Sequence, residues 1–295
     1  MSKRILITGA SRGFGKLTVD TLLEAGHQVA ASMRDPNGRN KAVADEQRAK
    51  GAHIIELDVT DDNSVNGGVN SAIEALGGLD VVINNAGVGV LGMQEHFTPE
   101  DIQRLFNINV IGVQRVNRAV IPHMRRQGSG LLILVSSLLG RMTLPFYGAY
   151  NASKWAAEAM AEAYRVELSG FGVDSCIVEP GGFPTSFFDS LITPSDNSRD
   201  AEYGEFMNAP KGMFEAFEGA LASNPAQNPQ LVADAIAGLI TTPAGSRPLR
   251  TVVDKMGMGD HIGPYNEHLD KLTHGIYSAF GIDGMLTLNV SQEGS

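Results

Sequence analysis

Buried-strand patterns alternate with helix patterns along most of this chain, and this alternation constrains the fold more than any other feature. Short apolar runs rich in branched residues recur at residues 4–8, 27–33, 52–57, 79–83, 131–135 and 173–178. Helix patterns lie between them at residues 40–50, 61–76, 99–127 and 150–170, and one more ends at Ala25. A further helix at 231–240 and a seventh strand at 249–253 follow. We therefore predict an α/β fold, a doubly wound seven-stranded parallel sheet with helices on both faces.

The chain of 295 residues is long enough for one large α/β domain, which we expect to span residues 1–295. Residues 186–226 break the alternation with a polar insert and an apolar helix-like piece. We interpret this segment as a substrate lid rather than as a second domain. Residues 254–295 form a C-terminal extension with a weak helix pattern at about 266–280.

A glycine-rich loop follows the first strand and precedes the first helix. It has the spacing Gly-x-x-x-Gly-x-Gly over Gly9, Gly13 and Gly15. Glycines allow backbone N–H groups to approach a pyrophosphate, and a helix N-terminus favours an anion. The loop therefore predicts dinucleotide binding. Its candidate contacts are Gly9, Ser11, Arg12, Gly13, Phe14 and Gly15.

The end of the second strand carries Arg34, about 20 residues past the glycine loop. At this position an acidic residue suits the ribose 2′-hydroxyl of NAD, and an arginine suits the 2′-phosphate of NADP. Asp35 is the next residue, and Arg12 is a possible second cation. We favour NADP(H), with NAD(H) possible. The alternative is that Arg34 is only a solvated loop charge.

The fifth strand ends at Ser136 and Ser137, and a helix that contains Tyr150 and Lys154 follows. Residues four apart on a helix lie on one face, so the phenol and the ammonium group are neighbours. A free phenol titrates near pH ~10, and an adjacent cation is expected to lower its pKa. This arrangement predicts proton transfer by Tyr150. The pair alone would also be compatible with a structural serine and a surface Tyr/Lys pair.

The joint pattern resembles the classical short-chain dehydrogenase/reductase superfamily, with its Rossmann fold. The matching residues are Thr8-Gly9-x-x-x-Gly13-x-Gly15, Asp58, Asn84-Asn85-Ala86-Gly87, Asn109, Ser137, Tyr150-x-x-x-Lys154 and Pro180-Gly181-x-x-x-Thr185. Within the superfamily the chain is most similar to the group of 17β-hydroxysteroid dehydrogenase type 1 and the retinol dehydrogenases. Ser32-Met33-Arg34-Asp35-Pro36, Leu57-Asp58-Val59-Thr60-Asp61, Pro122-His123-Met124-Arg125, Gly128-Ser129-Gly130 and Val178-Glu179-Pro180-Gly181 carry that closer likeness. Pro184 departs from the pattern, since relatives often have a basic residue there.

The resemblance implies an oxidoreductase that interconverts an alcohol and a ketone or aldehyde with NADP(H). Tyr150 would be the general acid or base, Lys154 would hold the nicotinamide ribose, and Ser137 would bind the carbonyl oxygen. Ser137 is preferred to Ser136 because it stands at the family's usual distance from Tyr150. Asn109 would anchor a water that connects Lys154 to solvent. Further cofactor contacts would come from Arg34, Asp58, Val59, Asn85, Ala86, Gly87, Tyr150, Lys154, Pro180, Gly181, Phe183 and Thr185.

Apolar residues near the predicted site suggest a bulky apolar substrate. The candidate wall residues are Leu139, Met142, Leu144, Phe146, Phe183, Phe187, Phe188, Leu191, Ile192, Met207, Met213, Phe214 and Phe217. The last three, at helical spacing, could instead pack the lid helix on the body. Two rival functions stay open. One is a non-catalytic NADP(H)-binding regulator, and the other is an epimerase or dehydratase acting on a nucleotide sugar.

Composition limits the partners. The net charge of −10 argues against nucleic acid or an anionic membrane, and no apolar run approaches the ~18 residues of a membrane span. A single cysteine, Cys176, excludes an intramolecular disulfide and suits a reducing compartment, so we expect a cytoplasmic protein. We interpret Cys176 as a small buried residue rather than a nucleophile. The seven histidines show no metal-ligand spacing, so no metal is expected. By resemblance, we expect a homodimer or homotetramer.

Overall fold

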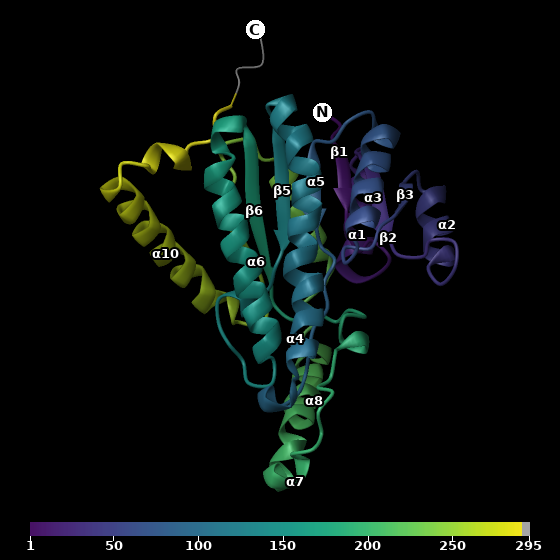
Figure 1. The fold of residues 1–295 in the computed structure, drawn as a ribbon, viewed down its shortest axis with the longest axis vertical. Coiled ribbons are helices and arrows are strands. Elements are labelled where there is room, and N and C mark those ends of the chain that lie inside the picture. The colour runs from purple at the N-terminus through teal and green to yellow at the C-terminus, as the bar shows by residue number, and fades with distance from the viewer. Residues whose placement is uncertain (291–295) are drawn as a thin grey trace.

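The computed structural model describes residues 1–290, and in this part a seven-stranded sheet has every strand parallel to its neighbours (Figure 1). The strands are β1 (Arg4–Ile7), β2 (Gln28–Met33), β3 (His53–Glu56), β4 (Val81–Asn84), β5 (Gly130–Val135), β6 (Val173–Pro180) and β7 (Arg250–Val253). Their order across the sheet is β3-β2-β1-β4-β5-β6-β7. This is a doubly wound Rossmann fold, and the predicted fold class is confirmed.

Helices cover both faces of the sheet because each strand buries side chains on both sides. One face carries α1 (Gly13–Glu24), α2 (Lys41–Ala49) and α9 (Gln230–Thr241), and the other carries α3 (Asp62–Leu76), α5 (Gly112–Gln127) and α6 (Gly148–Glu167). Ile5 and Ile7 of β1 pack into the first layer, and Leu6 between them packs into the second. Cys176 is fully buried in β6, as the sequence predicts.

The helical segment predicted at 99–127 has the predicted bounds, but it contains a π-helical turn that the sequence does not predict. The structure has α4 (Pro99–Phe106), a single π-helical turn η2 (Asn107–Ile111) and then α5. As predicted, Thr98 caps the start: its side chain accepts a hydrogen bond from Asp101 N. A π-helical turn inserts an extra residue and rotates the side chains that follow it. Asn109 lies in this turn and is only 2% exposed.

The segment 186–226 extends beyond the carboxyl edge of the sheet, at the lower end of Figure 1. It contains η5 (Phe188–Ser190), α7 (Asp200–Tyr203), η6 (Gly204–Asn208) and α8 (Ala209–Ala222). Its tip contacts η1 (Gln94–His96), where Tyr203 Oη donates a hydrogen bond to Glu95 Oε2 at 2.5 Å. The segment is therefore seated on the body of the molecule at its tip as well as at its two ends.

The C-terminal extension forms a longer helix than the weak pattern at 266–280 predicts. Helix α10 (Gly259–Ala279) starts seven residues earlier and is followed by η7 (Asp283–Leu286). Gly259, Gly263 and Pro264 argue against a helix in the sequence. The first turn forms nevertheless, and Gly259 N donates a hydrogen bond to Asp254 Oδ2 at 3.0 Å. The helix starts early because a residue of the preceding loop holds its first amide.

Candidate active site

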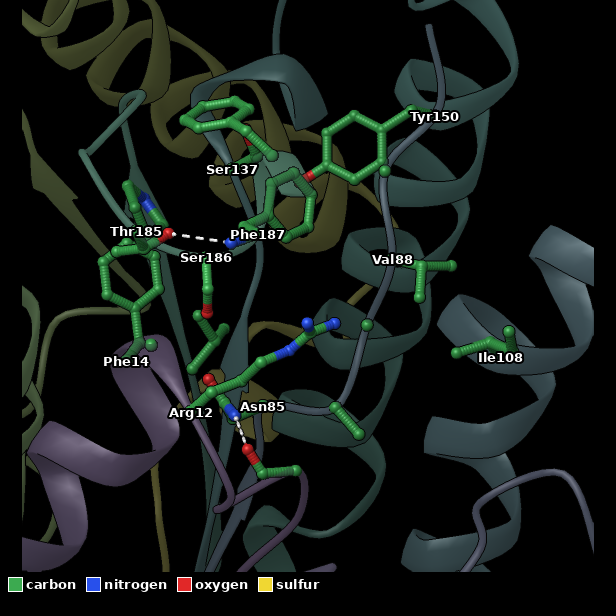
Figure 2. Close-up of a pocket in the computed structure, with 18 of the residues that line it drawn as sticks. Arg12, Phe14, Asn85, Val88, Ile108, Ser137, Tyr150, Thr185, Ser186 and Phe187 are labelled. Carbon is green, nitrogen blue, oxygen red and sulfur yellow. Dashed lines mark hydrogen bonds between the residues drawn. The ribbon is translucent and has the colours of Figure 1, made fainter. Parts of the chain in front are cut away.

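A cavity of about 500 Å³ lies at the carboxyl ends of the strands, where the strand order reverses between β1 and β4 (Figure 2). Ligands of open α/β sheets bind at this reversal. The cavity is lined by the glycine loop after β1, the ends of β2 and β3, the loop after β4, and the segments after β5 and β6. Met258, which follows β7, lines it too, so segments that follow all seven strands meet around one space.

Most of the residues that the sequence predicts for the site line this cavity. Those predicted to contact the cofactor and found in its wall are Gly9, Ser11, Arg12, Gly13, Phe14, Arg34, Asp58, Val59, Asn85, Ala86, Gly87, Tyr150, Lys154, Pro180, Gly181, Phe183 and Thr185. Ser137 lines it as well. Gly15 and Asn109 do not. Gly15 lies beneath the loop, where an added Cβ would stand 2.3 Å from Gly9 O, and Asn109 lies behind Gly87.

The glycine loop is pressed against the end of β4 by a side-chain network. Asn85 Nδ2 donates to Thr8 O at 2.9 Å and to Gly9 O at 3.1 Å, and Thr8 Oγ1 accepts from the backbone N–H groups of Asn85 and Ala86. Gly9 has φ +68°, and a Cβ there would stand 2.9 Å from Ala86 Cα. Only glycine fits this approach. The Asn85 side chain therefore braces the loop.

The start of α1 is suited to an anion. Arg12 is its N-cap residue, and no side chain accepts a hydrogen bond from the first amides of the helix. Those amides are oriented outward at the positive end of a 12-residue helix. A Cβ at Gly13 would meet only Thr185 Cβ, at 3.8 Å, so the approach to the loop is open there. The residues present thus fit the diphosphate of a dinucleotide.

Two arginines lie where the adenosine end of a dinucleotide would be. Arg34 and Arg39 both line the cavity, and Arg34 Nη1 is 3.9 Å from Asp58 Oδ2. Asp35 does not line it, because its carboxylate accepts a hydrogen bond from Arg39 N at 2.9 Å and closes the turn before α2. The sequence reading missed Arg39. Arg39 lies six residues beyond the end of β2, and nothing at that distance in the sequence indicates a cofactor contact. The turn at Asp35, with φ +47°, brings Arg39 back to the cavity wall.

Ser137, Tyr150 and Lys154 meet on one wall of the cavity, and each is less than a tenth exposed. Figure 2 shows the Tyr150 hydroxyl directed toward Ser137, with the Phe187 ring beside them. Lys154 Nζ lies 5.6 Å from the Tyr150 ring centroid and donates to Val135 O at 3.0 Å. Ser137 Oγ accepts a hydrogen bond from Leu139 N at 3.1 Å, which leaves its proton available for a substrate oxygen.

The titration of these groups differs from the sequence-based expectation. Burial raises the pKa of Tyr150 well above its ordinary value, and the nearby Ser137 hydroxyl opposes that shift. Burial also lowers the pKa of Lys154 to about 8, and Glu158 opposes that shift. We expected Lys154 to lower the pKa of the Tyr150 phenol toward neutral pH. For the protein without a bound cofactor, that expectation is wrong. Burial disfavours the charged form of both groups, and it outweighs their mutual effect.

Asn109 is a structural clamp behind the cavity wall. Its Oδ1 accepts from Val88 N at 3.0 Å, and its Nδ2 donates to Val88 O at 2.9 Å and to Ser153 Oγ at 3.1 Å. An added Cβ at Gly87 would stand 3.3 Å from Asn109 Oδ1 and 3.8 Å from Lys154 Nζ, so both groups lie next to Gly87. The water-anchoring role implied by the resemblance stays a prediction.

The remaining wall is apolar and aromatic. Rings of Tyr150, Phe187 and Phe188 follow one another with centroids 5.9 and 5.6 Å apart, and Phe188 contacts Phe214 and Phe217 of α8 at 5.6 and 5.5 Å. The predicted wall residues found in the cavity are Leu139, Leu144, Phe183, Phe187, Phe188, Met213 and Phe217. Those outside it are Met142, Phe146, Leu191, Ile192, Met207 and Phe214. Tyr147, unpredicted, lines the cavity three residues before Tyr150.

Comparisons with known proteins agree with this geometry. The family model described as short chain dehydrogenase matches residues 3–195. A 3-ketodihydrosphingosine reductase of Bacteroides thetaiotaomicron is 38% identical over 201 residues, which are 68% of this chain and 71% of that protein. Retinol dehydrogenase 8 of Bos taurus is 32% identical over 250 residues, which are 81% of this chain and 78% of that protein.

A solved structure adds a bound dinucleotide to the comparison. An alcohol dehydrogenase of the archaeon Thermococcus sibiricus, in complex with 5-hydroxy-NADP, is 26% identical to this chain with a TM-score of 0.67. The similarity covers 86% of this chain and 96% of that one.

Residues 1–290 contain neither a metal-binding cluster nor a helix that could span a membrane. No three His, Cys, Asp or Glu side chains in that range are grouped so that they could hold a metal ion. None of the helices in the described part has both the length and the apolar character needed to span a membrane.

Proposed function

The chain belongs to the short-chain dehydrogenase family, and from this we propose that it is an NADP(H)-dependent oxidoreductase that interconverts an alcohol and a ketone or aldehyde by hydride transfer. Oxidoreductase activity on a CH–OH group is the activity of its relatives. The observation that carries the proposal is that Ser137, Tyr150 and Lys154 line the same cavity as the glycine loop.

We assign the steps at the reacting carbonyl to two side chains, Ser137 and Tyr150, and the ammonium group of Lys154 would hold the nicotinamide ribose. The nicotinamide, when bound, supplies or accepts the hydride. In reduction, Ser137 donates a hydrogen bond to the carbonyl oxygen, where negative charge develops. Tyr150 gives its hydroxyl proton to the same oxygen, and in oxidation it takes that proton back. The raised pKa of Tyr150 keeps it protonated at neutral pH, which suits a general acid and so the direction of reduction.

NADP(H) is preferred in this proposal because of the charges at the adenosine end. Arg34 and Arg39 line the cavity there, whereas the carboxylate of Asp35 is engaged in its own turn. Guanidinium groups suit a phosphate, since they donate several charge-assisted hydrogen bonds. A ribose with a free 2′-hydroxyl would find no acidic partner at Asp35. NAD(H) remains the less favoured cofactor.

A bulky apolar substrate fits the remaining wall. The aromatic rings of Phe187, Phe188 and Phe217 border the side of the cavity that Tyr150 faces, and they belong to the segment 186–226 that we propose as a lid. Two relatives with comparable coverage are named for a sphingoid ketone and for retinol, both largely apolar molecules. The proposed lid also contacts the glycine loop, because Arg12 Nη2 donates a hydrogen bond to Ser190 Oγ at 2.7 Å.

The non-catalytic regulator gains no support from the comparisons, since the relatives reported above carry the names of enzymes. None of the relatives reported above is named as an epimerase or a dehydratase, so that alternative gains no support from them either. We also propose a cytoplasmic location, because a chain with a single cysteine suits a reducing compartment.

The test is consumption of NADPH against aldehydes and ketones graded by size and polarity, with Tyr150→Phe alongside. We expect turnover that rises with apolar bulk and falls by about 10²–10⁴-fold in Tyr150→Phe, because the variant lacks the transferred proton. Its affinity for NADPH should stay close to wild type. Near wild-type turnover in Tyr150→Phe would contradict the mechanism, and binding of NADPH without turnover of any compound would favour the regulator.

A further inference from the structure

A buried group of ionisable side chains lies directly behind the catalytic wall. We call Arg141, Glu158, Glu162, Glu179 and Arg250 the buried charge cluster. The side chains of Glu158 and Glu179 are fully buried, and those of the two arginines are at most 5% exposed. The roles proposed for Ser137, Tyr150 and Lys154 use none of these charges, so the cluster needs its own explanation.

Each arginine of the cluster contacts more than one carboxyl group. Arg141 Nη2 lies 2.6 Å from Glu158 Oε2 and 2.7 Å from Glu162 Oε1. Arg250 Nε lies 3.6 Å from Glu158 Oε2 and 3.4 Å from Glu179 Oε1. Three carboxyl groups thus share two guanidinium groups. Burial, followed by the nearby Glu158, raises the pKa of Glu179 to about 8, so Glu179 holds a proton at neutral pH.

Glu158 connects the cluster to the active site. It lies one turn after Lys154 on α6, so the two side chains share a face of the helix. Its Oε1 accepts a hydrogen bond from Ser136 Oγ at 2.5 Å, and Ser136 lines the cavity next to Ser137. A Cβ at Gly140 would stand 2.1 Å from the same Glu158 oxygen, so Gly140 leaves room for the carboxylate. Glu158 therefore contacts the strand end that presents Ser137.

We propose that Glu158 is a positioning residue of the active site: its carboxylate keeps the buried Lys154 side chain cationic and holds the strand end at Ser136 and Ser137. This inference rests on the proposed function, because it concerns the ammonium group that would bind the nicotinamide ribose. Glu158 itself lies behind the wall and touches neither substrate nor cofactor.

The surroundings of Lys154 show why it needs an anion. Its neighbours on the cavity side are uncharged: Tyr150, the Asn109 amide next to Gly87, and Val135 O. Burial lowers the pKa of Lys154, and Glu158 is the charged group that acts in the opposite direction. A buried ammonium group without a compensating charge would lose its proton near neutral pH.

The C-terminal helix completes the cluster from outside. Asn266 Nδ2 of α10 donates to Glu179 Oε2 at 2.6 Å, and Arg250 Nη1 lies 3.1 Å from Asp270 Oδ1 of the same helix. The cluster that contains Glu158 thus takes its members and their partners from β6, β7, α6, α10 and the loop that carries Arg141. Each arginine of the cluster is thereby paired with at least two carboxylates.

The experiment measures the affinity for NADPH by fluorescence titration from about pH 6 to about pH 10, together with kcat. The variants are Glu158→Gln, Glu162→Gln and Lys154→Met. A pH-dependent affinity bends at the pKa of the free enzyme's titrating group. Glu162→Gln is the matched control, because Glu162 lies one turn further along α6 and contacts the same two arginines, while its carboxylate is a third exposed and does not contact Ser136.

We expect the wild-type affinity to weaken above a bend near pH 8, where Lys154 loses its proton. Without the anion, Glu158→Gln should move the bend to lower pH by at least about one unit and reduce kcat. Glu162→Gln should leave the bend in place. Lys154→Met should abolish the bend. This variant shows whether the bend comes from Lys154 or from Glu179, because the pKa of Glu179 lies in the same range.

An unchanged bend in Glu158→Gln, or a bend that persists in Lys154→Met, would overturn the proposal. Should Glu158→Gln not fold, Glu158→Asp decides: it keeps the charge but does not reach Ser136, so the bend should stay while kcat falls, and an unchanged kcat would contradict the proposal. Failure of the proposed function is a separate result, because it would appear as near wild-type turnover in Tyr150→Phe.

Discussion

Individual side chains are the basis of the proposed preference for NADP(H). Asp35 and Arg34 are adjacent in the sequence, yet only Arg34 lines the cavity, because the Asp35 carboxylate accepts the Arg39 N–H within its own turn. Arg39 is brought to the same wall by that turn. In the proposed function, the preference for a 2′-phosphate over a ribose hydroxyl therefore depends on the direction of the Asp35 carboxylate, which leaves Arg34 and Arg39 in the cavity wall.

We predict that Arg34→Asp lowers the ratio of kcat/KM for NADPH to that for NADH by about 10- to 100-fold, since a charge-assisted contact contributes about 1.5–3 kcal/mol. Steady-state kinetics with both cofactors measures this ratio. Arg48→Asp is the matched control, because it changes the net charge equally from α2 but lies outside the cavity. If the ratio were the same in wild type and Arg34→Asp, the preference for NADP(H) would have to be abandoned.

At the scale of elements, the π-helical turn η2 matters most for the site. It separates α4 from α5 and turns Asn109 inward, where three hydrogen bonds connect η2 to Val88 and Ser153. Val88 belongs to the loop after β4, and Ser153 precedes Lys154 on α6. One amide therefore connects the loop that borders the proposed cofactor site to the helix that carries Tyr150, the proposed proton donor.

Asn109→Ala should destabilise the protein by about 1–3 kcal/mol, because it leaves the partly buried Val88 backbone groups without their Asn109 partner. Thermal unfolding with and without NADPH measures the loss, and kcat should fall with it. The matched control is Asn107→Ala in the same turn, whose side chain makes no hydrogen bond within residues 1–290. Equal losses in the two variants would show that the turn itself, and not the Asn109 contacts, carries the stability.

At the scale of the whole molecule, the parallel sheet brings the ends of distant segments to one edge, and the cavity and the segment 186–226 lie at that edge (Figure 1). The face formed by α5, α6 and η2 leaves some large apolar side chains exposed. Ile111 is 46% exposed and Trp155 is 39% exposed. The family resemblance implies that two chains pair through the helices that hold Asn109 and Tyr150. Ile111 lies in the same element as Asn109, and Trp155 lies in the same helix as Tyr150.

We predict a homodimer or homotetramer in solution, and Ile111→Glu should shift it toward the monomer, because the substitution buries a charge at the contact. Light scattering at micromolar concentration measures the mass. Phe280→Glu is the control, since Phe280 is 75% exposed at the end of α10, away from that face. A monomeric mass for the wild-type protein would refute this prediction.

The sequence by itself determined what depends on neighbours along the chain. The order of strands and helices follows from short apolar runs and helical periodicity, and the pairing of Tyr150 with Lys154 follows from their spacing on one helix. The glycine loop was readable because a turn with positive φ and a close backbone approach require glycine at Gly9.

Only the tertiary structure decided the features that depend on burial and on contacts between distant segments. The pKa of Tyr150 is raised rather than lowered because the folded chain removes its hydroxyl from water. Asn109 turns inward because a π-helical turn interrupts its helix, and Arg39 reaches the cavity because Asp35 closes a turn. Glu158 meets Arg141 and Arg250 across β5, β6 and β7, and no local pattern encodes that meeting, since desolvation and charge pairing are set by the fold as a whole.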